Sequence, residues 1–239
     1  MQERVPLKIN SFTTQEITRH IMAHSFGYIY LSWRKGNGYS RHIVGVIKIN
    51  SSGNSKFAYI SHAVKEARSD GFTPYTEFPD LDKEYTENVL EIFSQRLIKS
   101  ERGDISTFLD FWEIPHKYAD DKLYLLAHTQ GWLPTDNFEF LADFNPTKKA
   151  CFVTDLAGLT RLSIPSDRIA INDILTFKTI PMKEDKYAVQ VYKDDLFLGY
   201  IKKIHNRIFY KKTSHKLKIK VKAIEKNGIL KRVFLKISS

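Results

Sequence analysis

The chain has 239 residues, of which 42% are apolar and 13% aromatic, enough to bury a core in one large domain or two small ones. The sequence has neither an apolar run of about 18 residues that would cross a bilayer nor an N-terminal secretory signal, so we expect a cytoplasmic protein with no membrane partner. Cys151 is the single cysteine, which excludes an internal disulfide and a thiolate metal cluster.

Positive charge is concentrated towards the end of the chain. The formal net charge is +10, and residues 200–239 hold 13 Lys or Arg against one acid, a balance of +12 that leaves −2 for the remainder. Such a distribution indicates attraction to a polyanion, and nucleic acid is the commonest polyanion of the cytosol. The alternative is a lysine-rich strand edge that stays in solvent and resists pairing with other chains.

The first half of the chain mixes helical and strand patterns. A capping-box sequence at Thr13 predicts a short amphipathic helix. Residues 72–85 contain two prolines and no helical period, which predicts an ordered loop pinned by its aromatic rings, with Gly71 ending the preceding helix. The expected strands are 28–33, 42–49 and 56–60, and the helices that follow the loop are 88–99, 104–112 and 119–130.

From residue 137 onward the pattern changes to short strands with little helical sequence. The expected strands are 138–140, 150–155, 174–180, 188–192, 196–201, 217–224 and 232–237. The turn-rich stretch 143–147 marks a boundary. We therefore expect an α+β fold, with an α+β domain over residues 1–143 followed by a small, mostly β, barrel-like domain over residues 144–239.

Several short motifs of the second domain follow one another in an informative order. A strand ends in Ala-Gly-Leu at 157–159, the strand Ile-Leu-Thr-Phe covers 174–177, Ala-Val-Gln-Val covers 188–191 after Asp185, and the next strand ends in Gly-Tyr-Ile at 199–201. This order resembles the HIRAN family, a barrel-like module that binds DNA and in eukaryotic translocases captures single-stranded 3′ ends. The chain departs from the family at Glu184, where an aromatic ring is usual, and at Thr160-Arg161, where Arg followed by an aromatic residue is usual.

The first domain also carries motifs in a consistent order. They are Tyr-Leu-Ser-Trp at 30–33, His-Ile-Val-Gly at 42–45, Gly-Phe-Thr-Pro at 71–74, Phe-Pro-Asp-Leu at 78–81, and the segments 93–97 and 125–129. They resemble the N-terminal part of HipA-like proteins, as in bacterial two-domain HIRAN proteins and HipS-type antitoxin subunits. HipA kinases carry their active site in a further C-terminal domain, whose phosphate loop and catalytic aspartate this sequence lacks. We therefore expect no enzymatic activity and no cofactor.

The basic segment after the Gly-Tyr-Ile strand end interleaves cations with aromatic rings, the composition that neutralises phosphates and stacks bases. Alternation also places four lysines on one strand face: Lys216, Lys218, Lys220 and Lys222. For the tyrosines, packing inside the barrel is an equal alternative. With the positions that the HIRAN resemblance implies, the expected nucleic-acid-binding residues are Arg161, Asp185, Lys186, Tyr200, Lys202, Lys203, Arg207, Tyr210, Lys211 and Lys212.

Two groups of residues have the spacing of metal ligands. His20 and His24 stand four apart, as in a zinc helix, but the general-base glutamate of such a helix is replaced by Ile21, and a solvated helix edge is favoured. Three carboxylates alternate through a loop: Asp80, Asp82 and Glu84. They could hold a divalent ion, although a turn in which Asp side chains bond nearby amides is favoured. No metal site is predicted, and a metal-dependent nuclease is a minor alternative.

The sequence predicts a non-catalytic DNA-binding protein that recognises single-stranded DNA or DNA ends through the HIRAN-like domain, in DNA repair or in defence against phage or plasmids. The HipA-like domain would contact a protein partner or extend the surface. The alternative is a HipS-like regulatory subunit that docks on a HipA-type kinase through an exposed Trp33 and the loop 72–85. DNA and RNA remain equally compatible with the residues, as does either strand polarity.

Overall fold

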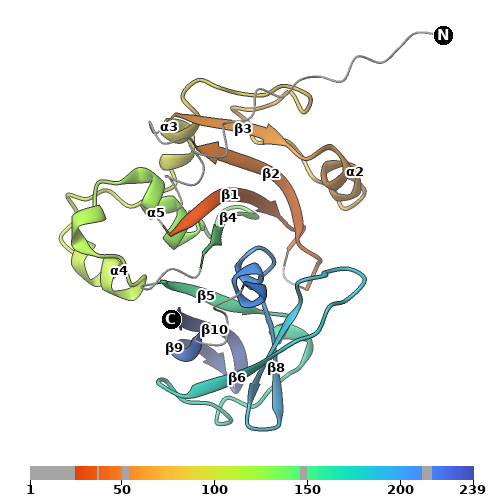
Figure 1. Cartoon of the computed structure of the whole chain (residues 1–239), viewed down its shortest axis with the longest axis vertical. Coiled ribbons are helices and arrows are strands. Elements are labelled where there is room, and N and C mark those ends of the chain that lie inside the picture. The colour runs from red at the N-terminus through yellow and green to blue at the C-terminus, as the bar shows by residue number, and fades with distance from the viewer. Residues whose placement is uncertain (1–24, 37, 50–53, 146–149, 212–216) are drawn as a thin grey trace.

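The computed structural model describes residues 25–36, 38–49, 54–145, 150–211 and 217–239. Within these residues the strands form a four-stranded sheet and a closed six-stranded barrel, which lie one above the other in Figure 1. The described chain is α+β, as expected. The predicted helix near Thr13, with His20 and His24, lies outside the described residues, as do Lys212 and Lys216.

The four-stranded sheet is built almost entirely from predicted strands. They are β1 (Phe26–Trp33), β2 (His42–Ile49), β3 (Ser55–Tyr59) and β4 (Phe138–Phe144). All neighbours are antiparallel, in the order β3-β2-β1-β4. β4 is longer than the predicted 138–140 because it pairs along the whole length of β1, so that Phe144 lies opposite Phe26.

Short helices cover the sheet and one side of the barrel. They are α2 (Ser61–Ser69), α3 (Val89–Ser94), α4 (Ile105–Phe111), the 3-10 turn η1 (His116–Tyr118) and α5 (Lys122–Thr129). In Figure 1, α3, α4 and α5 gather on one side of the molecule and α2 packs against β2 at the other. The prediction of a helix to residue 99 was wrong, because the buried Arg96 turns inward to donate to the Gly131 carbonyl and the Asp136 carboxylate.

The segment 72–85 is a loop whose rings enter the core, as predicted. Phe72 and Phe78 are buried, and Tyr85 forms an isolated bridge with Phe57 in β3. The expectation that Trp33 is exposed was wrong, because only 7% of its surface is accessible and its ring packs edge-on against Phe72 at 5.5 Å. Trp33 therefore offers no docking surface to a partner.

The barrel is formed by the second half of the described chain. Its strands are β5 (Cys151–Ala157), β6 (Ile174–Thr179), β7 (Val189–Lys193), β8 (Leu196–Ile201), β9 (Lys218–Asn227) and β10 (Ile229–Ser238). Two 3-10 turns, η2 (Leu159–Arg161) and η3 (His205–Tyr210), follow β5 and β8. The strand order is β10-β5-β8-β7-β6-β9, closed by the pairing of β9 with β10.

The Gly-Tyr-Ile strand end is explained by a close approach of two strands. Gly199 has φ +130°, and a Cβ at this position would lie 2.5 Å from the carbonyl oxygen of Ala157 at the end of β5. A side chain of any L-residue would clash with this backbone oxygen. Glycine at this position therefore lets β8 pair with β5, where Tyr200 lies opposite Ala157.

Sheet and barrel share apolar contacts. The last strand of the sheet ends at Phe144, within the turn-rich stretch 143–147, and the first strand of the barrel begins at Cys151. The Phe144 and Phe152 rings stack between sheet and barrel with centroids 4.0 Å apart.

Among the described residues no helix combines the length and apolar composition needed to span a bilayer.

Candidate nucleic-acid interface

Polar and charged side chains gather where one face of β4 meets the barrel, a region here called the junction. Side chains alternate along a strand, so one face of β4 presents Glu139 and Asp143 while Phe140 and Phe144 point to the other side. η3, the blue coil between sheet and barrel in Figure 1, packs against β4. The C-terminal cations therefore meet carboxylates of the sheet.

Lys202 lies in the interior of this junction. Its side chain is 2% exposed, and its Nζ donates to Glu139 Oε2 at 2.9 Å and to Gln130 Oε1 at 2.8 Å, with Asp155 as a further ion-pair partner. Burial alone would raise the pKa of Glu139, but Arg41 and Lys202 outweigh it and hold that pKa well below its usual range. Lys202 has no surface left for a phosphate, so its prediction as a nucleic-acid contact was wrong.

Much of the C-terminal positive charge is used in the same way. Five cations from residues 200–239 pair with carboxylates that precede the barrel in the sequence. The pairs are Lys202–Glu139, Arg207–Asp143, Lys211–Asp143, Lys222–Glu113 and Lys236–Glu113. Part of the C-terminal positive charge therefore joins the barrel to the sheet and to the segment after α4, and fewer cations face solvent than the net charge of this segment suggests.

Beside Asp143, rings and cations gather in one partly exposed group. Arg207 Nη1 donates to the Tyr30 hydroxyl at 3.1 Å, and the guanidinium lies 4.8 Å from the Tyr30 ring centroid and 5.8 Å from that of Tyr187. The Tyr187 and Tyr210 rings meet edge-on at 5.4 Å. Burial lowers the pKa of Arg207, but the contacts with Tyr30 and Asp143 outweigh this effect and raise the pKa, so the guanidinium stays protonated.

Further polar residues border these rings. Lys186 Nζ stands 5.1 Å from the Tyr187 centroid, and Asp185 accepts hydrogen bonds from the Asn206 side chain at 2.7 Å and from the Tyr187 amide at 2.9 Å. Lys211 Nζ bonds Asp143 and the carbonyl of Phe144. We call the whole group the tyrosine–arginine patch: Tyr30, Asp185, Lys186, Tyr187, Arg207, Tyr210 and Lys211.

The patch unites five of the ten predicted binding residues: Asp185, Lys186, Arg207, Tyr210 and Lys211. Sequence reasoning missed Tyr187, although it directly follows Lys186 and continues the mixture of cations and rings. It also missed Tyr30, whose contact with Arg207 joins residues 177 positions apart, and no local pattern signals such a contact.

Three further predicted binding residues lie outside this patch. Tyr200 packs beside Gly158 and meets Phe197 edge-on at 5.2 Å, and Lys203 is half-buried. Arg161 is exposed and donates from Nη2 to the Gly38 carbonyl at 2.7 Å, linking η2 to the loop between β1 and β2. The structure thus does not join them in the tyrosine–arginine patch.

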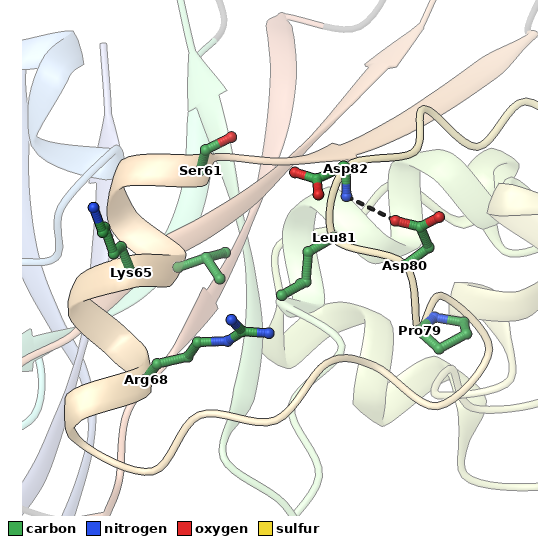
Figure 2. A pocket seen from close by; sticks show the side chains of 8 residues that line it. Ser61, Lys65, Arg68, Pro79, Asp80, Leu81 and Asp82 are labelled. Carbon is green, nitrogen blue, oxygen red and sulfur yellow. Dashed lines mark hydrogen bonds between the residues drawn. The ribbon is translucent and has the colours of Figure 1, made fainter.

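The carboxylate loop of the first half borders a separate pocket. Figure 2 shows this pocket between α2, which carries Lys65 and Arg68, and the loop that carries Asp80 and Asp82; Arg68 extends towards the loop. Asp80 Oδ1 accepts from the Asp82 amide at 2.9 Å, the turn expected from sequence, while Glu84 pairs with Lys56. Within the described residues no three His, Cys, Asp or Glu side chains gather as a metal-binding group.

No protein family, curated protein or solved structure in the comparisons matches this chain. We therefore infer the function from the geometry of the described residues and from the physical chemistry of their side chains.

Proposed function

We propose that the protein binds single-stranded nucleic acid, with the tyrosine–arginine patch as its contact surface. The observation that carries the proposal is the meeting of Tyr187, Tyr210 and Arg207 with centroid distances below 6 Å on a partly exposed surface. Aromatic rings stack bases of any sequence, and nearby cations track the phosphate backbone. Binding to DNA ends, in repair or in defence, is the form of this function that the HIRAN resemblance favours.

The charges of the patch imply modest affinity. Its cations are Lys186, Arg207 and Lys211, and Asp143 and Asp185 stand beside them. Carboxylates compete with phosphates for the same cations, so the net attraction is small. We expect a Kd of roughly 1–100 µM at physiological salt, strengthening steeply as salt is lowered.

Fluorescence anisotropy tests this function. A labelled single strand with a free 3′-hydroxyl is compared with the same strand blocked at its 3′ end, with blunt duplex and with RNA, each over a salt series. Preference for the free 3′ end would support end recognition, whereas equal affinity for both single strands would restrict the function to generic strand binding.

A pair of matched variants identifies the surface. Lys186→Glu with Tyr187→Ala removes one cation and one ring from the patch, and should weaken binding about tenfold because a stacked base contributes about 1–3 kcal/mol. Lys117→Glu with Tyr118→Ala is the control, since Lys117 stands over the neighbouring Tyr118 ring at 4.8 Å in the same manner, on η1. Equal affinities for the two double variants, or no binding by the unmodified protein, would overturn the proposal.

A further inference from the structure

The junction contains a second concentration of charge, around Lys202 rather than Arg207. Four cations surround two carboxylates, an excess of two positive charges among side chains that are at most 31% exposed. We call this group the arginine cluster: Arg34, Arg41, Lys202, Arg232, Glu139 and Asp155.

The charged side chains of the cluster differ in how far they are exposed to solvent. Lys202 and Glu139 are buried, whereas Arg34, Arg41 and Arg232 are 31%, 11% and 16% exposed and form the solvent side of the cluster. The arginines come from three places in the chain: the end of β1, the start of β2 and the barrel strand β10. The fold therefore brings three guanidinium groups next to the carboxylates that the buried Lys202 also contacts.

The arginines are not equally compensated. Arg41 Nη1 lies 2.7 Å from Glu139 Oε2 and donates to Ser32 Oγ at 2.9 Å. Arg232 Nε donates to Asp155 Oδ2 at 3.1 Å, whereas Arg34 comes only within 4.0 Å of Glu139. Both carboxylates thus serve other cations first, and Arg34 retains most of its hydrogen-bonding capacity.

Electrostatic repulsion between the arginines of the cluster also favours the binding of an anion. Burial lowers the pKa of Arg34, and the charges of Arg41 and Arg232 lower it further, against the opposing effect of Glu139 and Asp155. Like charges held close together in a half-buried place are destabilising unless a counter-charge lies between them. An anion among the three guanidinium groups would supply that charge.

Trp132 adds a flat ring to the same place. The Arg232 guanidinium lies 4.7 Å from its ring centroid, and the tryptophan is 41% exposed. Trp33 and Trp112 are buried at 7% and 8%, so Trp132 is the solvent-accessible indole and a natural reporter. An exposed indole beside cations is a surface on which a base can stack.

We propose that Arg34, Arg41 and Arg232 bind the phosphate group of a nucleotide, whose base contacts Trp132. Guanidinium forks match phosphate oxygens two at a time, which makes arginine the preferred residue for such a group. The phosphate can belong to a free nucleotide or to the end of a strand. The site uses no member of the tyrosine–arginine patch, so it does not require strand binding there.

The test is a titration of the full chain, followed by Trp emission and by calorimetry. The probes are pyrophosphate, AMP, and a short single strand with or without a 5′-phosphate. We expect saturable binding of AMP that Arg34→Gln weakens at least tenfold, while Arg102→Gln leaves it unchanged. Arg102 is a matched control because it is an exposed arginine that pairs with the nearby, equally exposed Asp104.

The outcomes separate the parts of the proposal. Arg34→Gln keeps the buried Lys202–Glu139 pair, and an unchanged melting temperature would show that lost binding is not lost folding. Trp132→Ala should weaken AMP binding but not pyrophosphate binding, and equal effects on both would overturn the base contact. A single strand that binds only with its 5′-phosphate would identify a strand end as the source, whereas AMP binding alone identifies a free nucleotide. No saturable binding of any probe, or the same affinity in Arg34→Gln and Arg102→Gln, would overturn the site.

Discussion

Lys202 Nζ in the barrel lies 2.9 Å from Glu139 Oε2 in the sheet, and both side chains are almost wholly removed from water. Leaving either charge buried without the other would carry a large free-energy penalty. The pair therefore favours the one arrangement of sheet and barrel in which Lys202 and Glu139 meet. Gln130 Oε1, at 2.8 Å, accepts a second hydrogen bond from the same ammonium group.

Replacing Lys202 by methionine should therefore destabilise the protein strongly. Lys202→Met leaves Glu139 and Asp155 without their shared cation, and we expect the free energy of unfolding to fall by about 3–5 kcal/mol in urea titrations. Lys122→Met is the matched control, because Lys122 pairs with Glu91 on the exposed surface, and such a pair contributes about 1 kcal/mol or less. Equal losses in the two variants would contradict the structural role of Lys202.

His128 should make the protein sensitive to mild acid. Its ring stacks on Tyr124 with centroids 4.1 Å apart, and among the described residues neither ring nitrogen meets a hydrogen-bond partner. Burial lowers the pKa of His128 from 6.5 to about 3. Because the unfolded chain takes up this proton below pH 6.5 and the folded chain does not, stability present above pH 6.5 is lost as the pH falls towards 3.

His128→Phe keeps a ring of similar shape and removes that proton uptake. At pH 5 the variant should gain about 2 kcal/mol relative to the original protein, over and above any difference at pH 8, as measured by urea unfolding at both pH values. His205, whose pKa burial also lowers to about 3, keeps part of the acid sensitivity. A pH dependence identical in His128→Phe and the original protein would show that His128 does not carry this effect.

Gly199→Ala should weaken the barrel. The new Cβ would meet the Ala157 carbonyl oxygen at 2.5 Å in a backbone conformation with φ +130°, so β5 and β8 must move apart. We expect a loss of about 1–3 kcal/mol and a lower melting temperature. Gly103→Ala should have little effect, since a Cβ added at Gly103 would meet nothing within 4 Å. A comparable loss of stability in Gly103→Ala would show that the close approach of β5 to Gly199 is not the cause.

Asp143→Asn should strengthen nucleic-acid binding if the proposed function is correct. The change releases Arg207 and Lys211 from their shared carboxylate. Each released cation that reaches a phosphate should steepen the salt dependence on a single strand by about 0.7 in log–log slope. Glu113→Gln alters net charge equally but releases Lys222 and Lys236, outside the patch. Anisotropy should show tighter binding for Asp143→Asn only, and equal changes would indicate a general charge effect.

Most of the fold could be predicted because its elements follow local periodicity. β8, Leu196–Ile201, and β2, His42–Ile49, begin and end at the predicted residues, since both are short runs dominated by β-branched, aromatic and other apolar residues. The helix expected over 88–99 stops early because Arg96 binds Asp136, a partner 40 residues away. Tertiary contacts of this kind override local propensity.

The candidate sites were only half visible in the sequence. A run of lysines and tyrosines indicates a charged surface, but burial depends on which carboxylates the fold brings near. Lys202 and Lys186 stand in similar sequence contexts, yet Lys202 is buried in an ion pair with Glu139 while Lys186 is exposed to solvent. Arg34 and Arg232 lie almost 200 residues apart, so the arginine cluster leaves no local signature.

The closure of the barrel by β10 has a consequence for how the chain folds. β10 pairs with β9 next to it and with β5, the strand at the opposite end of the barrel sequence. A contact between such distant segments requires the loss of much chain entropy before it is rewarded, so it forms late. We expect amides of β1 and β2 to become protected from hydrogen exchange before those of β5 during refolding, and simultaneous protection would show that sheet and barrel form as one cooperative unit.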